Sequence, residues 1–156
     1  MNADLKWLSA TTDAEYRGGS FNGKSLIETV KGYTLEQVKS TDTFENYTVR
    51  GIVLHNMYFK WMVIKFIDPD NPTQFDYEKT DWPSIPGEGT SEDWNKTLKD
   101  SDMIHDEYMK QLGNLVPEGL EREVDEWKCP LGQAVAWIAT HDSYHAAQIR
   151  NMGLKE

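Results

Sequence analysis

The feature that most constrains the fold is a stripe of regularly spaced side chains toward the C-terminal end of the chain. Between residues 131 and 152, mostly apolar positions recur at intervals of three and four residues. The stripe consists of Leu131, Ala134, Ile138, His141, His145, Gln148 and Met152. These intervals follow the 3.6-residue turn of an α-helix, so we expect a helix from Pro130 to about Met152 with one face in the protein interior.

Two more long helices are predicted upstream of this one. The first begins after Thr48, a residue suited to the N-cap position, and ends at residues 66–67. The second begins after Thr90 and ends near Gly113. Residues 68–90 between them hold four of the six prolines, and we expect a long loop that aromatic side chains tie to the rest of the protein.

Shorter signals complete the prediction. Ser25 and Thr34 both begin capping-box sequences, which indicates two short helices, or one broken helix, between residues 25 and 40. Residues 3–16 have few aliphatic anchors, and we expect an irregular helical arm there. Residues 120–128 alternate weakly, but no partner strand is evident. The pattern favours an all-α fold, a four-helix bundle formed by residues 1–156 as a single domain.

Composition excludes several classes of function. Sixteen Lys and Arg residues against 26 Asp and Glu residues give a net charge of −10, which disfavours binding to nucleic acid. The single cysteine, Cys129, forms no internal disulfide and no thiolate cluster, and we interpret it as an ordinary small residue near a helix start. We find neither a basic, apolar leader nor an apolar run of the roughly 18 to 20 residues that span a bilayer. We therefore expect a cytoplasmic protein with no membrane contact.

Three histidines occupy positions that face the interior by pattern. His141 and His145 lie four residues apart, about 6 Å along the helix axis, so both rings stack on one helix face. His55 lies between Ile52 and Phe59 in the apolar stripe of the earlier helix. Each buried imidazole without a partner would cost about 1 to 3 kcal/mol, so the pattern indicates either core hydrogen bonds or a shared metal ion. Three protein ligands would leave coordination positions open, as in catalytic sites.

Neighbouring polar residues have weaker signals. His105 also falls on a helix stripe, but its acidic surroundings favour a partly exposed, acid-paired side chain outside the metal site. Asp142 and Gln148 are both placed to orient a histidine ring. Surface solvation explains Asp142 better, whereas Gln148 faces the stripe. Tyr58 and Tyr144 either approach the open side of the site or pack in the core.

Several of these segments together resemble a known family. The segments are Tyr47 to His55, Asp81-Trp82-Pro83, Trp94, and Trp137 to Ile149 with its pattern H-x-x-Y-H-x-x-Q-I. They resemble the DinB-like (DinB/YfiT) superfamily over most of the chain from about residue 16. Family members usually have Gly before the Gln of this pattern, where Ala147 stands here.

The resemblance implies a four-helix bundle that holds a divalent metal ion with three histidines, which map onto His55, His141 and His145. Three inward histidines with open coordination positions favour a metal-dependent enzyme that acts on a small molecule, either a hydrolase or a thiol transferase. Between these two, the resemblance favours transfer of a low-molecular-weight thiol. The ion would lower the pKa of a bound thiol or water. Zinc, nickel, iron and manganese all accept three nitrogen ligands, so the metal is not identified.

A second hypothesis belongs to a different class of function. A metal-binding bundle without catalytic activity would act in a stress response by association with other molecules. The aromatic-rich segment 75–94 would then cover either a homodimer interface or a pocket. A metal ion open to solvent favours the enzyme, and an ion sealed by loop side chains favours this alternative.

Overall fold

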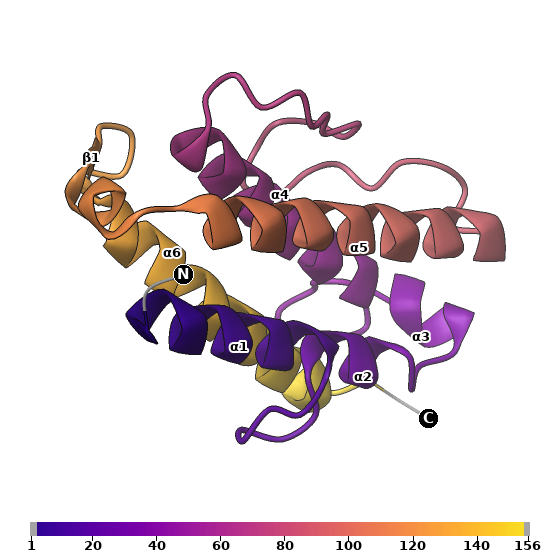
Figure 1. The fold of residues 1–156 in the computed structure, drawn as a ribbon. Coiled ribbons are helices and arrows are strands. Elements are labelled where there is room, and N and C mark those ends of the chain that lie inside the picture. The colour runs from indigo at the N-terminus through magenta and orange to yellow at the C-terminus, as the bar shows by residue number, and fades with distance from the viewer. Residues whose placement is uncertain (1–2, 155–156) are drawn as a thin grey trace.

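The computed structural model describes residues 3–154, and helices dominate it (Figure 1). Its elements, in chain order, are α1 (Ala3–Arg17), α2 (Leu26–Val30), α3 (Leu35–Lys39), α4 (Val49–Ile67), α5 (Ser91–Asn114), the 3-10 helix η1 (Pro117–Glu121), β1 (Glu123–Val124), β2 (Cys129–Pro130) and α6 (Leu131–Asn151). The four longest helices pack against one another, α4 against α5 and α6, and α1 against α5 and α6. In Figure 1, α1 and α5 lie in front of α6 and α4. The described residues are mostly helical, in agreement with the predicted all-α class, and they also include one small two-stranded sheet.

The predicted helix starts are confirmed by their caps. Ser25 and Thr34 each form a capping box, with Glu28 and Gln37 as the reciprocal partners. The hydroxyl of Thr48 accepts a hydrogen bond from the backbone N–H of Gly51 at the start of α4. These bonds satisfy N–H groups that the first helical turn leaves unpaired, which is why local sequence is enough to locate the starts.

The prediction of an irregular N-terminal arm is wrong. Residues Ala3–Arg17 form one continuous helix, and its inner face consists of Leu5, Thr12, Glu15 and Tyr16, all buried. Polar and aromatic residues make up much of this face, so the aliphatic periodicity that marks the other helices is weak here. Packing against α5 and α6 stabilises the helix despite its weak local signal.

The strand-like segment 120–128 does have a partner. β1 pairs antiparallel with β2, with Val124 opposite Cys129 and Glu123 opposite Pro130. The partner strand lies immediately before α6, in residues whose sequence indicates a helix start. The tight connection between the strands includes Lys128 at a φ of 50°.

The core contains two clusters of buried apolar side chains that meet along α4 and α6. On α4, Ile52 and Val53 belong to one cluster, and Leu54 belongs to the other. On α6, Ile138 and Ala146 belong to different clusters. The three candidate histidines therefore lie at the junction of two apolar regions, which removes much of the water around their rings.

The long loop 68–90 is tied down by aromatic side chains, as predicted. Trp61 donates a hydrogen bond from Nε1 to the carbonyl oxygen of Thr73, and Phe75 is buried. Trp82 stacks on Tyr47 and on His55. The loop thus delivers residues 81–82 to the side of α4.

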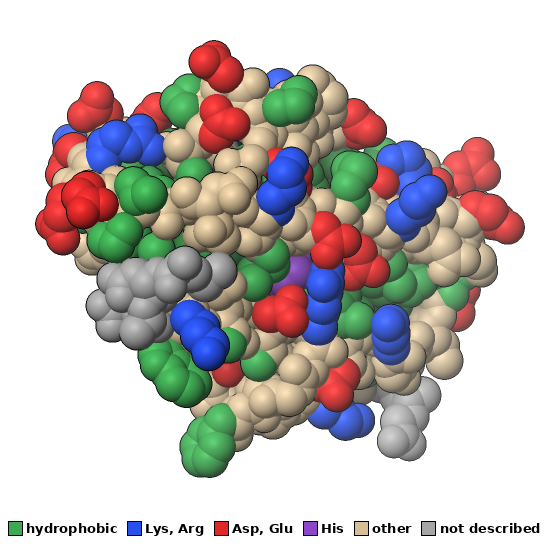
Figure 2. Space-filling view, viewed as in Figure 1, with side chains coloured by type: hydrophobic (Ala, Val, Ile, Leu, Met, Phe, Trp, Pro, Cys, Tyr) green, Lys and Arg blue, Asp and Glu red, His purple; other side chains and the backbone are tan. Residues whose placement is uncertain are grey.

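The visible face over α1 and α5 has a mixed charge distribution. Figure 2 shows acidic side chains beside Lys and Arg over both helices, with no basic patch on that face. Among residues 3–154, no helix combines the length and the apolarity that crossing a membrane requires.

Candidate metal centre

Three imidazole nitrogens from two helices converge between α4 and α6. The Nε2 atom of His141 lies 3.1 Å from Nε2 of His55 and 3.1 Å from Nε2 of His145. One nitrogen from each histidine falls within 4.8 Å of the other two. The rings of His141 and His145 are perpendicular, with centroids 4.5 Å apart, as expected for side chains one helical turn apart. The sequence-predicted histidines are therefore brought together by the fold.

The outer nitrogens of two rings are held by acceptors. Nδ1 of His55 lies 2.7 Å from the backbone carbonyl oxygen of Asp81, and Nδ1 of His145 lies 2.6 Å from Oε1 of Gln148. A carbonyl oxygen cannot donate, so each Nδ1 carries a proton. In a neutral ring the other nitrogen, Nε2, then presents its lone pair to the centre of the cluster.

The orientation of Gln148 is itself fixed. Its amide nitrogen Nε2 donates a hydrogen bond to Oε2 of Glu45, which leaves Oε1 for His145. The predicted role of Gln148 in orienting a ring thus agrees with its contacts, and Glu45 and the Asp81 carbonyl are partners that the sequence did not reveal. These partners can be identified only from the tertiary structure, because Glu45 and Asp81 lie on separate loops far from α6 in sequence.

The inner nitrogens fit a cation better than they fit one another. His55 and His145 both direct lone pairs at Nε2 of His141, which carries at most one proton in a neutral ring and therefore satisfies at most one of them. A divalent ion accepts all three lone pairs. Nitrogen ligands about 2.0–2.1 Å from a tetrahedral ion lie about 3.3–3.4 Å apart. The two separations from His141 are close to this value, and the separation between the nitrogens of His55 and His145 is within 4.8 Å.

Burial keeps these rings neutral near pH 7. It lowers the pKa of His141 to about 3, with further lowering from His145, His55 and Lys60. Burial likewise lowers the pKa of His145 to about 4, although the bond to Gln148 opposes the shift. The pKa of His55 is also lowered by burial, against the opposing effect of Asp81. Neutral imidazole is the form that binds metal ions, so the free ligands are in the required state.

The cluster is covered on one side and accessible on another. Trp82 stacks on His55 with centroids 4.0 Å apart, and Phe59 meets His55 edge-on at 4.9 Å. His55 and His145 are buried, but His141 is only half-buried and lines a cavity. A bound ion would therefore be reached from the His141 side.

The prediction that Asp142 lies on the surface is wrong. Asp142 is fully buried, and its Oδ2 lies 2.7 Å from the ammonium nitrogen of Lys60, which is also buried. The same ammonium lies 3.7 Å above the ring of Tyr16. Burial raises the pKa of Asp142 and lowers that of Lys60, while the attraction between the two charges opposes both shifts. A lysine in the apolar run of α4 was the signal for this pair.

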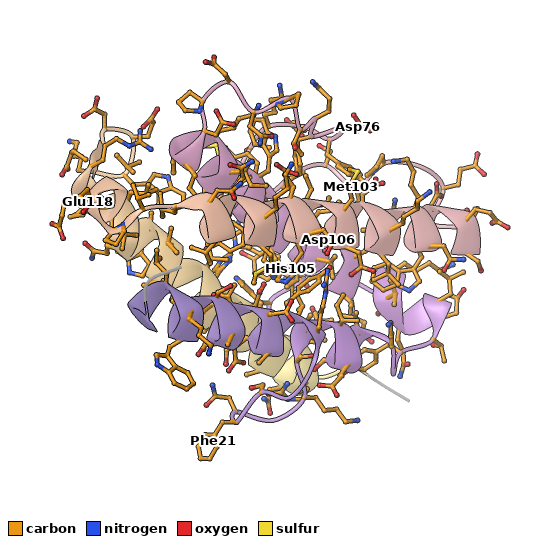
Figure 3. All side chains as sticks on the ribbon, viewed as in Figure 1. Phe21, Asp76, Met103, His105, Asp106 and Glu118 are labelled. Carbon is orange, nitrogen blue, oxygen red and sulfur yellow. The ribbon has the colours of Figure 1, made fainter. Side chains whose placement is uncertain are left out.

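The prediction that His105 is partly exposed is wrong, but the predicted pairing with an acidic side chain agrees with its contacts. The side chain is fully buried, stacks on Tyr16 at 3.9 Å, and places Nε2 3.1 Å from Oδ1 of Asp13. Figure 3 shows His105 on the side of α5 that faces α1. It is acid-paired and outside the three-histidine cluster.

The other residues considered from the sequence, Tyr58, Tyr144 and Cys129, differ in their surroundings. Tyr58 packs among Phe59, Trp61 and Phe75, so it belongs to the aromatic packing. Tyr144 is 63% exposed and meets the ring of His145 edge-on at 4.9 Å. Cys129 is buried in β2.

Compared with known proteins, the chain matches no family model, no curated protein and no solved structure. The resemblance to the DinB-like superfamily therefore rests on the sequence motifs alone and stays a prediction.

Proposed function

We propose that the chain binds one divalent metal ion through Nε2 of His55, His141 and His145 and acts as a metal-dependent enzyme on a small molecule. The observation that carries the proposal is the convergence of these three nitrogens, two of them with lone pairs directed inward by partners at Nδ1. Zinc, nickel, iron and manganese are all compatible with this donor set. A divalent ion supplies Lewis acidity, which lowers the pKa of a thiol or water that reaches it.

The protein's own groups would prepare the site in three ways. The Asp81 carbonyl and Gln148 hold two rings in the tautomer that presents Nε2 inward. Trp82 and Phe59 cover His55 and exclude water from that side. The partial exposure of His141 leaves an approach for a substrate. This open side favours an enzyme over a metal-binding bundle without activity.

Two reaction classes suit such an ion, hydrolysis by a bound water and transfer of a bound low-molecular-weight thiol. The resemblance to the DinB-like superfamily favours thiol transfer. The packing of α1, α4, α5 and α6 is compatible with the four-helix bundle that this resemblance implies. A homodimer and a cytoplasmic location remain expectations of the sequence.

Metal analysis and activity assays on one preparation test this proposal. We expect freshly purified protein to contain close to one divalent ion per chain by elemental analysis. We also expect the loaded protein to conjugate a low-molecular-weight thiol to an electrophile, or to hydrolyse an ester or lactone, and to lose the activity on chelation. Stoichiometric metal without turnover across both panels would contradict the enzyme and support the non-catalytic alternative.

A further inference from the structure

A cavity lies beside the candidate metal centre and shares only His141 with it. Its volume is about 530 Å³, and it lies between α4, α6 and the β1–β2 turn. Aromatic side chains dominate its lining, with Phe59 from α4, Trp127 from the turn, and Trp137 and Tyr144 from α6. His141 lines the same cavity, so this space opens directly onto one of the three converging histidines.

The position of the aromatic residues on α6 is set by helical spacing. Trp137, His141 and Tyr144 follow one another at intervals of four and three residues, which places all three on one helix face. Trp137 is 44% exposed and Tyr144 is 63% exposed. Large aromatic surfaces that are open to water beside a candidate metal-binding histidine indicate a site where a small molecule binds and covers them.

The lining is uncharged. Among the side chains that the structure describes, no Lys, Arg, Asp or Glu borders this cavity. Trp127 lies 5.7 Å from Phe59 and 6.1 Å from Trp137 between ring centroids, so the three rings form a continuous apolar wall. The cavity on the other side of Tyr144 differs, because Glu45, Gln148 and Asn151 line it.

We propose that the aromatic cavity is a specificity site that binds an uncharged aromatic or other apolar group of the substrate while a polar atom of the same molecule reaches the ion. This inference rests on the proposed function for the metal and adds the substrate class. A volume of about 300–1,000 Å³ is usual for sites that bind small molecules. The cavity's volume and its opening onto His141 favour a small molecule over a macromolecular partner as its occupant.

Two hydroxamates provide the test, because both chelate metals and only one carries an aromatic ring. Affinities of acetohydroxamate and benzohydroxamate are measured on the zinc-loaded protein by calorimetry. We expect benzohydroxamate to bind about tenfold or more tightly, through burial of the ring. In Trp137→Ala the advantage should fall to about threefold or less, with zinc stoichiometry and the affinity for acetohydroxamate unchanged.

Trp7→Ala is the matched control, since Trp7 is 70% exposed on α1 and does not line the cavity. This variant should keep the full preference for the aromatic hydroxamate. Alanine is a strong helix former and Trp137 is partly exposed, so we expect Trp137→Ala to fold, as circular dichroism would check.

The outcomes separate this inference from the metal site. Equal affinities for the two hydroxamates on stoichiometrically loaded protein would overturn the aromatic site and leave the metal proposal standing.

If zinc does not bind, the metal proposal fails, and the neutral fluorophore N-phenyl-1-naphthylamine tests the cavity alone. Fluorescence enhancement lost in Trp137→Ala and kept in Trp7→Ala would support an apolar site, and equal enhancement in both would overturn it. A dimer that Trp137→Ala dissociates, without any aromatic preference, would overturn it in favour of an interface between copies.

Discussion

His145 illustrates how much of the site depends on single side chains. One ring nitrogen is held by Gln148, and the other lies 3.1 Å from His141 at the centre of the cluster. The residue belongs to the apolar stripe of α6, yet its contacts are polar on both sides of the ring. Its neutral state, with a pKa lowered to about 4 by burial, leaves the inner lone pair available near pH 7.

Replacing this ligand should remove the ion. We expect His145→Ala to lose most bound metal in elemental analysis, because two histidines on different helices bind far less tightly than three. Its melting temperature in metal-containing buffer should also fall, because the stabilisation linked to metal binding is lost. Asn151→Ala, an exposed position on the same helix, is the control. Stoichiometric metal in His145→Ala would show that the ligand assignment is wrong.

Gln148 offers a finer test, because it contacts the outer nitrogen of His145 and would not itself bind the metal ion. The amide holds Nδ1 of His145 at 2.6 Å. Replacement by Leu removes this acceptor at similar volume, and we expect metal affinity to fall about 10- to 100-fold, the usual effect of losing a partner of a ligand histidine. Competition with a chelator of known affinity measures this change. An unchanged dissociation constant would mean that Gln148 does not orient the ring.

At the scale of elements, the ion pair between Lys60 and Asp142 joins α4 to α6 in the interior. Both side chains are almost fully buried and lie 2.7 Å apart. Removing one partner would leave the other charge buried and unpaired, so we expect Lys60→Met or Asp142→Leu alone to lower the free energy of unfolding by about 3–5 kcal/mol. Denaturant unfolding of both single variants and the double variant measures the coupling.

The double variant is the decisive member of that set. It should lose much less stability than the sum of the two single losses, because no unpaired charge remains in the core. Additive losses would show that the two side chains do not interact in the folded protein.

The cap of α5 gives a test of fold that leaves the site untouched. The hydroxyl of Thr90 accepts a hydrogen bond from the backbone N–H of Asp93, and α5 contributes none of the three clustered histidines. Thr90→Ala should lower the free energy of unfolding by about 1 kcal/mol without changing metal stoichiometry. Denaturant titration measures the free energy of unfolding, and elemental analysis of the same sample measures the metal stoichiometry. Loss of metal in this variant would indicate that the site depends on α5 in a way its contacts do not show.

The elements that sequence predicted well are those defined by local chemistry. The start of α4 at Thr48 and the capping boxes at Ser25 and Thr34 depend on residues within one helical turn. The spacing of apolar residues along α6 predicted that His145 faces the interior, because the side of the helix on which a residue lies depends only on its position within that helix. The burial of Asp142 depends on Lys60 from α4, and that of His105 depends on Asp13 and Tyr16 from α1. Periodicity within one helix contains no information about such partners.

At the scale of the whole molecule, the histidine cluster connects the two buried apolar regions. His55 lies on α4 and the other two on α6, so an ion bound by all three would tie these helices together at the point where the two clusters meet. Metal binding and folding should therefore be coupled.

This coupling predicts that stability depends on free metal concentration. At a free metal concentration 100-fold above the dissociation constant, a single site stabilises the folded state by about 2.7 kcal/mol. We expect the melting temperature to rise with added zinc or nickel and to fall on chelation. A melting temperature independent of metal over that range would mean that the folded chain does not bind the ion preferentially.

The location of the ion is tested most directly by anomalous X-ray diffraction from crystals grown with zinc, with data collected above the zinc absorption edge. The three-histidine site predicts one strong anomalous peak about 2.0–2.1 Å from Nε2 of His55, His141 and His145. An absent peak at these nitrogens, with the rings hydrogen-bonded among themselves, or a strong peak only elsewhere on the protein, would contradict it.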